Sequence, residues 1–185
     1  REVVTEYSST TSRAVIQHDL TADSNIYASL SEGFKAGGYA TYECTEPYDP
    51  EEVTSLEFGF KGSLGENTSL NASLFRYDYT DFQVLQVVGI QTVTRNAGDA
   101  TVNGLELEAL TNVSDSLTLN YGVTLLDATY GDFLNTNGLE PQLGVQQLEG
   151  NYLSNAPKVS VNFGLNYTNI LSSGSSLTYL SLIHI

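Results

Sequence analysis

The sequence predicts an all-β protein, a segment of an antiparallel transmembrane β-barrel with short turns on one rim and long loops on the other. Three observations lead to this prediction. Apolar and polar residues alternate along many segments, several of these segments exceed the usual strand length of about five or six residues, and the connections between them alternate between short and long. Helical periodicity is nearly absent, and Thr, Ser, Tyr, Val, Asn and Gly are common.

Eight strands are expected along the chain. Seven of them lie at about residues 12–19, 25–34, 54–63, 67–80, 101–111, 116–129 and 157–168. The remaining segment, 84–95, is predicted as one strand, but Gly89 interrupts its pattern and it is alternatively part of a long loop. A ninth strand is expected to begin near residue 176.

The connections carry more information than the strands. Short connections rich in turn residues lie at 20–25, 63–67, 111–116 and 168–176, and long ones at 35–53, 80–100 and 130–156. If 84–95 belongs to its loop, short and long connections alternate along the whole chain. A membrane barrel has short turns at one rim and long loops at the other, whereas a soluble sandwich has no reason to keep that order. The order therefore favours a barrel.

The stretch PKVSVNFGLNY, residues 157–167, illustrates the alternation. Val159, Val161, Phe163, Leu165 and Tyr167 share one parity, and only Ser, Asn and Gly separate them. In a barrel the apolar parity faces lipid and the polar parity faces a water-filled lumen. In a soluble β-sandwich the same pattern places the apolar parity in a closed core. Alternation alone leaves both architectures open.

Aromatic residues gather near strand ends. Tyr77, Tyr79 and Phe82 precede one long loop, and Tyr130 follows another strand. Such a distribution is expected of the girdles that mark the two membrane interfaces. Tyr and Phe are also common in strands generally, and the chain contains no Trp.

Charge and composition exclude several classes of protein. Seven Lys and Arg against 22 Asp and Glu give a formal net charge of -15, so we expect no nucleic-acid partner. The single cysteine, Cys44, allows no internal disulfide and no zinc cluster. No run of about 18 apolar residues encodes a transmembrane helix. The first residues, REVVTEYSST, lack a basic region followed by an apolar stretch, so no signal peptide is expected within this chain.

No catalytic, metal or cofactor site is predicted, and we expect no enzyme. GFKAGG (33–38) is interpreted as a strand exit into a loop, because no helix follows to form a phosphate cradle. The acidic stretch YECTEPYDPEE (42–52) lacks EF-hand spacing, so a solvated loop is favoured over a cation site. Glu106 and Glu108 share a parity and are interpreted as wall charges rather than a glycosidase pair. His18 and His184 are too isolated for a metal site or a triad.

Five stretches resemble, in this order, the later barrel strands of TonB-dependent outer-membrane receptors. They are NIYASLSEGFKAGGY (25–39), PEEVTSLEFGFKG (50–62), NASLFRYDYTDFQVLQ (71–86), NAGDATVNGLELEAL (96–110) and SNAPKVSVNFGLNY (154–167). No single stretch is diagnostic, and their order carries the resemblance over roughly residues 13–168.

The resemblance implies a barrel of about 22 strands closed by a plug domain, of which this chain would supply about eight. It implies location in the outer membrane of a Gram-negative bacterium and active uptake of a scarce nutrient, most often a ferric siderophore, with haem, cobalamin and some glycans as other cargoes. The implied partners are outer-membrane lipid, the plug and remaining strands of the parent chain, the small-molecule ligand, and the TonB energy-transducing complex, which is contacted through the plug.

The chain departs from the complete family pattern. It contains no plug or Ton box, and its last stretch, SLTYLSLIHI, lacks the terminal aromatic strand of a finished barrel. We therefore expect residues 1–185 to be part of a receptor barrel domain, truncated at both ends, and interpret residues 177–185 as candidate non-native sequence.

Ligand contacts are expected from the long loops. The candidate residues are Tyr39, Tyr42, Asp49, Tyr130 and Tyr152, because aromatic and acidic loop residues can stack on or hydrogen-bond an exposed ligand. Two other functions stay open from the sequence. One is a soluble β-sandwich ligand-binding module, and the other is the wall of a passive porin, whose parent chain would have no plug.

Overall fold

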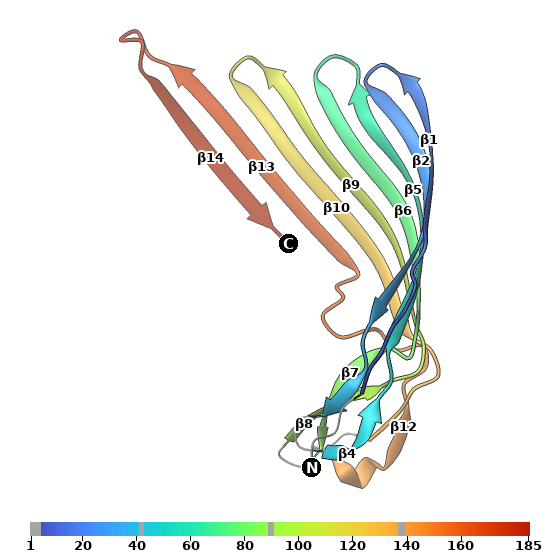
Figure 1. Cartoon of the computed structure of the whole chain (residues 1–185). Coiled ribbons are helices and arrows are strands. Elements are labelled where there is room, and N and C mark those ends of the chain that lie inside the picture. The colour runs from blue at the N-terminus through green and yellow to red at the C-terminus, as the bar shows by residue number, and fades with distance from the viewer. Residues whose placement is uncertain (1–4, 41–42, 89–90, 137–139) are drawn as a thin grey trace.

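One antiparallel sheet of eight strands in chain order dominates the structure, a computed structural model that describes residues 5–40, 43–88, 91–136 and 140–185 (Figure 1). The predicted all-β fold is confirmed. The strands are β1 (Arg13–Thr21), β2 (Ser24–Lys35), β5 (Glu51–Leu64), β6 (Thr68–Thr80), β9 (Ala100–Ser114), β10 (Leu117–Tyr130), β13 (Val159–Ile170) and β14 (Ser176–His184).

The connections of the sheet confirm the predicted order of short and long. Short turns join β1 to β2, β5 to β6, β9 to β10 and β13 to β14 at one end of the sheet, and the long connections lie at the other end (Figure 1). Gly65 and Gly174 occupy two of these turns with φ of 68° and 81°, a left-handed backbone that glycine adopts without strain.

Three two-stranded pairs lie in the long connections. They are β3 (Gly38–Ala40) with β4 (Glu43–Tyr48), β7 (Gln83–Val88) with β8 (Gln91–Asn96), and β11 (Leu134–Thr136) with β12 (Val145–Gln147). One short 3-10 turn, η1 (Pro141–Leu143), precedes β12. Within the described ranges, none of the helical structure is long or apolar enough to cross a membrane.

The prediction of a single strand at 84–95 is wrong, and the alternative reading of this segment as part of a long loop is correct. The chain turns back on itself, and Val88 pairs with Gln91 to form the hairpin β7–β8. Gly89, which interrupted the pattern, lies outside the described residues. A hairpin within a loop alternates in the same way as a strand of the main sheet, so the pattern alone could not separate them.

Cross-strand register arranges the apolar residues into continuous rows. One row contains Ile26, Phe60, Ala72, Leu107, Val123 and Val161. The next row along the strands, on the opposite face, contains Tyr27, Gly59, Ser73, Glu106, Thr124 and Ser160. Residues that pair directly across an antiparallel sheet point to the same face. One face is therefore apolar along its rows, and the other is mainly polar.

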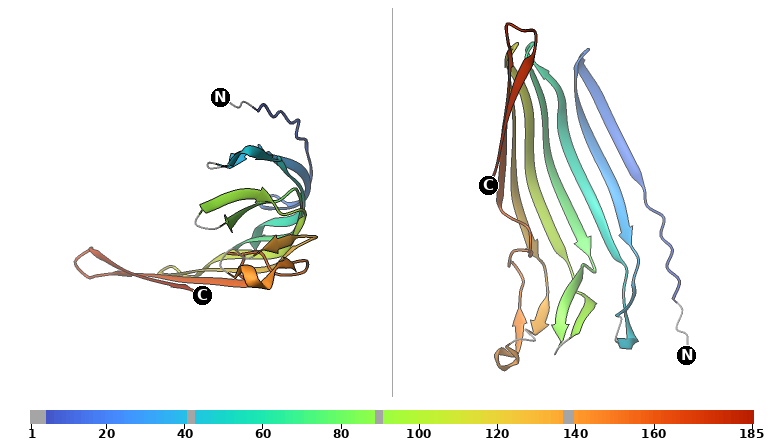
Figure 2. Two further views of the ribbon diagram at one scale, coloured as in Figure 1. Left: turned by 90° about the horizontal axis from the view of Figure 1, so that it is seen from below. Right: turned by 90° about the vertical axis from the view of Figure 1, so that its left-hand side faces the viewer.

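The apolar face has no second sheet against it in the described residues. Ile16, Leu74 and Val159 are 74%, 58% and 55% exposed, although they belong to its central rows. Viewed end-on, the sheet is an open arc whose two free edges are β1 and β14 (Figure 2). A β-sandwich would seal these side chains in an interior, so the sandwich architecture is not the one that the chain adopts.

The height of the apolar band matches a membrane. Along β10 the apolar parity runs from Leu117 to Leu125, and Asp127 follows on the same face. Nine residues at about 3.4 Å each cover about 27 Å along the strand. At a tilt of about 40° they cover about 21 Å of bilayer, close to the usual band of about 25 Å. On β6, β9 and β10, the polar residues Arg76, Asn103 and Asp127 end the band on the side of the long loops, whereas β5 and β2 carry Leu56 and Leu30 in the same row.

The aromatic girdle lies elsewhere than expected. Tyr77 belongs to the polar face, where its ring stacks on Phe75 at 4.8 Å, so it cannot mark the membrane interface. On the apolar face, Tyr167 and Tyr179 pair across β13 and β14 near the short turns, with ring centroids 6.2 Å apart. These two tyrosines therefore lie at the turn rim, whereas Phe58 and Phe60 of the same face lie within the apolar band.

Large side chains on the polar face lie over glycines of the neighbouring strand. Tyr27 crosses Gly59 and Phe75 crosses Gly104, each directly opposite in register. The Tyr27 hydroxyl donates to the carboxylate of Glu57, and its ring lies 5.4 Å from the ammonium group of Lys61. The missing Cβ atoms let these rings lie flat along the wall instead of projecting from it.

Strand β14 departs from the rest of the sheet. It pairs with β13 in continuous register, which confirms a ninth element near residue 176. However, Leu180 and Leu182 pair with Asn166 and Gly164 of the polar face, so β14 is apolar on both sides. This change of pattern coincides with the segment interpreted as non-native, and that interpretation stays a prediction.

Because neighbouring residues of a strand point to opposite faces of the sheet, two neighbouring substitutions in the complete receptor should change the free energy of unfolding by unequal amounts. Val123→Arg places a charge in the middle of the apolar band and should lower the free energy of unfolding in phospholipid vesicles by about 2–4 kcal/mol. Thr124→Arg places the same side chain on the polar face, opposite Glu106, and should cost less than about 1 kcal/mol. A urea titration of both variants measures the difference, and equal losses would contradict the assignment of the faces.

The Phe75 ring lies over Gly104, so substitutions at these two positions should have coupled effects on the free energy of unfolding. Gly104→Ala should lower the free energy of unfolding by about 1–3 kcal/mol, because its Cβ would overlap the Phe75 ring. In a Phe75→Ala background the same change should cost much less, since the obstacle is gone. The double-mutant cycle reports this coupling, and additive losses would show that the close approach is unimportant.

Candidate functional site

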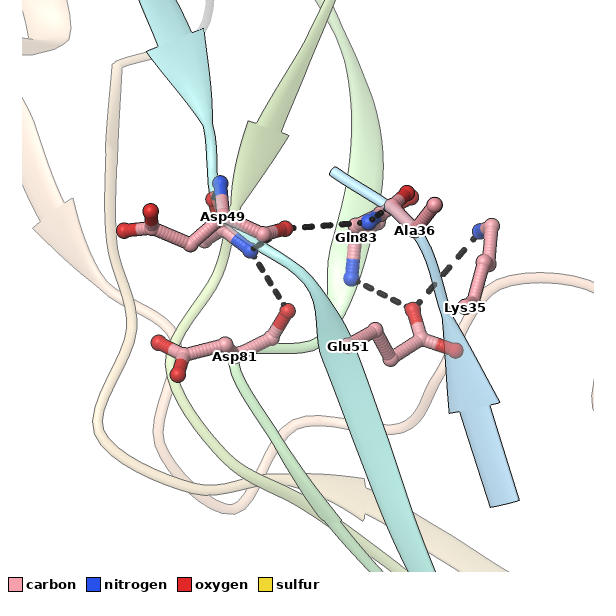
Figure 3. A network of polar contacts seen from close by, with 7 residues as sticks. Lys35, Ala36, Asp49, Glu51, Asp81 and Gln83 are labelled. Atoms are coloured by element: carbon pink, nitrogen blue, oxygen red, sulfur yellow. Dashed lines mark hydrogen bonds and ion pairs between the residues drawn. The ribbon is translucent and has the colours of Figure 1, made fainter. Parts of the chain in front are cut away.

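The hairpin β7–β8 anchors the first long connection through two amide side chains at its base. Gln83 and Asn96 are cross-strand partners there. The amide nitrogen of Gln83 donates to the carbonyls of Ala36 and Asp49 at 3.1 and 3.0 Å (Figure 3). Because these carbonyls flank β3 and β4, one side chain holds both ends of that segment.

Asn96 acts as a second clamp on the same segment. Its amide oxygen accepts from the backbone N–H of Asp49 at 2.7 Å, and its amide nitrogen donates to the Asp49 carbonyl at 3.0 Å. The same nitrogen donates to the carbonyl of Asp81 at 2.7 Å. Asp81 has a positive φ of 52°, a backbone that is uncommon outside glycine. Asn96 therefore satisfies three backbone groups at the junction of two loops.

Glu51 links this junction to the end of β2. Its carboxylate accepts from the backbone N–H of Gln83 at 2.7 Å and lies 3.7 Å from the ammonium group of Lys35 (Figure 3). The side chain of Glu51 is largely buried, whereas that of Lys35 is mostly exposed. A carboxylate used in this way is structural, so Glu51 of the acidic stretch 42–52 is a loop anchor and not only part of a solvated loop.

Packed apolar side chains lie beneath the loops. Apart from Ala109, the apolar residues that are buried in the described part of the chain all lie at this end of the sheet, and they are Val93, Ala97, Ala100, Ala128 and Phe133. A chain of rings ends at Phe133, with centroid distances of 5.3 Å from Tyr79 to Phe82, 6.4 Å from Phe82 to Tyr130 and 5.3 Å from Tyr130 to Phe133. This cluster gives the loops a rigid base.

Two of the predicted ligand residues belong to a tyrosine group at the first loop. Tyr39 pairs with Pro47, and Asp49 follows β4. Tyr7, from the segment before β1, donates to the carbonyl of Tyr48 at 3.4 Å. Partial desolvation, and then the negative charge of Asp49, raise the pKa of Tyr7 above its ordinary value. Its hydroxyl is therefore a protonated hydrogen-bond donor at neutral pH. Tyr42 lies outside the described residues.

The other two predicted residues line a cavity of about 330 Å³ between the hairpin β7–β8 and the third long connection. Tyr130 and Tyr152 share it with Gln86, Asn135 and Leu148. The amide nitrogen of Gln86 donates to the Asn135 side chain and to the carbonyl of Thr136 at 3.4 Å, so the hairpin and the loop are tied across the cavity.

Tyr152 is held against the end of β10. Its backbone bridges to Thr129, and the ammonium group of Lys158 lies 3.6 Å from the centroid of its ring. Leu153 donates its backbone N–H to the carbonyl of Ala128 at 2.9 Å. The return path of the third connection therefore runs along β10, which fixes one wall of the cavity.

The sequence analysis missed the amide side chains that organise this site. Gln86 lies in the segment 84–95 that is predicted as one strand, and Gln83 and Asn96 flank that segment. The signal was weak, because a single residue, Gly89, interrupts the alternation of this segment. Their partners are far away in the sequence, and only the folded chain brings Asp49 or Asn135 to them.

Other charged residues of the polar face belong to the wall. Glu106 and Glu108 lie with Lys61 and Asn71 around a polar hollow of about 230 Å³, which agrees with their interpretation as wall charges. In the part of the chain that the structure describes, no group of three or more His, Cys, Asp or Glu side chains could hold a metal ion. A hollow of about 620 Å³ beside Ile16, Phe58 and Leu74 belongs to the apolar face and not to the loops.

The sheet and its loops define the wall of a large β-barrel with a polar surface at one rim. The family model described as TonB dependent receptor-like, beta-barrel, matches residues 2–182, so the chain belongs to the TonB-dependent receptor family. This is a family of outer-membrane receptors of Gram-negative bacteria. The predicted resemblance is confirmed.

Individual relatives agree with the family. The chain is 29% identical over 143 residues to the probable TonB-dependent siderophore receptor PiuA of Acinetobacter baumannii, and the match covers 74% of this chain and 18% of that protein. The chain thus spans about a fifth of the length of this curated relative.

Solved structures share the fold. The ferric yersiniabactin uptake receptor FyuA of Yersinia pestis superposes with a TM-score of 0.73 at 18% identity, over 93% of this chain and 25% of that one. The ferric preacinetobactin receptor BauA of Acinetobacter baumannii superposes with a TM-score of 0.66 at 19% identity, over 94% and 25%. These similarities show a partial barrel.

The clamp at the base of the hairpin predicts a local effect in the complete receptor. Asn96→Ala removes the acceptor of the Asp49 N–H, and a hydrogen bond of about 1–1.5 kcal/mol corresponds to about tenfold in opening. Hydrogen exchange at the Asp49 amide should therefore accelerate about tenfold. Thr92→Ala, on an exposed position of the same strand, should leave that rate unchanged. Equal rates in the two variants would show that the side chain does not hold the loop.

Proposed function

We propose that the chain is part of a TonB-dependent outer-membrane receptor that takes up a ferric siderophore. The observation that carries the proposal is an apolar band of bilayer height on one face of a wall whose long loops gather at one rim. Relatives named as siderophore, ferric yersiniabactin and ferric preacinetobactin receptors support this cargo class. A passive porin has no energised partner, and membership of the receptor family favours active uptake over that alternative.

The proposal assigns a partner to each surface of the chain. Outer-membrane lipid covers the apolar face, and the plug and water of the parent receptor meet the polar face with Tyr27, Glu106 and Glu108. The remaining strands of the barrel continue from the free edges of β1 and β14. The TonB complex acts through the plug, outside this chain. Nucleic acid is no partner, and no enzymatic step is assigned.

Ligand contact is proposed for the loop rim. The residues are Tyr39, Tyr42, Asp49, Tyr130 and Tyr152, of which Tyr130 and Tyr152 line the cavity beside the hairpin and Tyr39 and Asp49 lie in the tyrosine group. Phenol groups can donate a hydrogen bond and present an aromatic face at the same time. Both features suit a ligand that carries chelating oxygens on an organic scaffold.

An uptake assay tests the proposal. A strain of the source bacterium without the receptor should lose accumulation of radioactive iron supplied as a ferric siderophore, and the intact gene should restore it. The restored uptake should require a functional TonB protein. The double variant Tyr130→Ala and Tyr152→Ala should weaken ligand binding to the purified receptor, with an unchanged amount of folded receptor in the outer membrane. Uptake that persists without TonB would indicate a passive pore, and unchanged uptake without the receptor would refute the proposal.

A further inference from the structure

We propose that the cavity beside the hairpin β7–β8 selects an uncharged ferric chelate of the hydroxamate type over a polyanionic ferric catecholate. This inference rests on the proposed siderophore uptake and specifies its ligand class. Three singly charged hydroxamates neutralise Fe³⁺, whereas three doubly charged catecholates leave a trianion. A site for the trianion therefore needs positively charged groups, whereas a site for the neutral complex does not.

Among the described residues that line the cavity, none carries an ionised group. Its polar members are the amides of Gln86, Asn135 and Asn151 and the hydroxyl groups of Ser154 and the two tyrosines, and the remaining members are apolar. A trianion placed there would lose hydration without gaining an opposite charge, and this loss is costly. A neutral chelate meets hydrogen-bonding groups for its carbonyl oxygens and apolar contacts, such as Leu85 and Leu148, for its aliphatic spacers.

The cations near the cavity already have partners. The ammonium group of Lys158 lies over the ring of Tyr152. Arg95 lies opposite Val84 in the hairpin and also has a partner. No described Lys or Arg is among the residues that line the cavity. The common means of holding a polyanion, a group of guanidinium or ammonium donors, is therefore not built into this part of the rim.

The surrounding charge acts in the same direction. The two connections that bound the cavity, residues 81–99 and 131–158, contain five acidic residues against the two cations Arg95 and Lys158. The acidic residues are Asp81, Asp99, Asp132, Glu140 and Glu149. The chain as a whole has a net charge of -15. Such a field lowers the local concentration of anions and slows their approach, whereas a neutral complex is unaffected.

The cavity is also held in shape before a ligand arrives. Gln86 bridges from the hairpin to Asn135 and Thr136, and Phe133 packs on Tyr130 beneath it. The backbone N–H of Leu148 donates to the carbonyl of Phe133 at 2.8 Å. A prearranged site loses little entropy on binding, so its discrimination between ligands depends on the chemistry of its lining.

Calorimetry on the complete, purified receptor tests the inference with two probes, a neutral ferric tris-hydroxamate and a trianionic ferric tris-catecholate. The receptor should bind the neutral chelate at least tenfold more tightly. Leu148→Trp should fill the cavity and weaken that binding at least tenfold. Leu143→Trp is the matched control, because it is on the same connection, is 51% exposed and does not line the cavity. The Leu143→Trp receptor should bind the neutral chelate with the same affinity as the unaltered receptor.

A second variant tests the inference independently, in case the Leu148→Trp receptor does not fold. Leu85 is 75% exposed, so Leu85→Lys leaves packing intact while it adds a cation to the lining. This variant should bind the trianion more tightly than the unaltered receptor does, and its preference for the neutral chelate should therefore be smaller. Equal or tighter binding of the trianion by the unaltered receptor would overturn the inference and leave siderophore uptake standing. So would normal binding of the neutral chelate by folded Leu148→Trp receptor. Binding of neither chelate, together with unchanged iron uptake in the strain without the receptor, would overturn the proposed function as well.

Discussion

Rows of apolar side chains without a protein partner set the conditions for the rest of this structure. The rows that contain Ile16, Leu74 and Val159 would be costly in water, at about 25 cal/mol for each Å² of apolar surface. In hydrocarbon that cost disappears, but every backbone N–H and C=O must then be paired inside the protein. Long antiparallel strands meet this second condition, and their register shifts at Asp19–Thr21 and at Leu117–Thr118 lie beside the short turns. The same lipid exposure that explains the apolar face therefore also explains the length and the regular pairing of the strands.

Confining apolar residues to one face moves all polar chemistry to the other face and to the loop rim. On the inner wall, rings lie over glycines, and Tyr27 is fixed between Glu57 and Lys61. At the rim, the hairpin β7–β8 is the common contact of the long connections, through Asn96 on one side and Gln86 on the other. A loop surface held in this way can offer a ligand fixed donors and rings, which is what a receptor of low-abundance cargo needs.

The sequence predicted the sheet well because its signals are local. Alternation along β13 and the turn residues between β5 and β6 follow from the pleat and from φ preferences, which neighbours in the chain determine. The hairpin β7–β8 was misassigned as one strand because a loop hairpin alternates like a wall strand. Four of the five predicted ligand residues lie in two described groups at the rim, but the pairing of Tyr130 with Tyr152 depends on contacts across distant segments. The clamps Gln83 and Asn96 could not be predicted, because their partners are backbone groups that only folding brings close.

Accessibility along β10 tests most directly whether the apolar rows face lipid. In the complete receptor in outer-membrane vesicles, with Cys44 replaced by serine, single cysteines at each position from Leu117 to Leu126 can be spin-labelled and probed with oxygen and with a water-soluble nickel complex. The account predicts strict alternation, with odd positions open to oxygen and even positions open to nickel. Odd positions shielded from both reagents would mean that the rows pack inside a sealed protein core, and that result would contradict the membrane barrel.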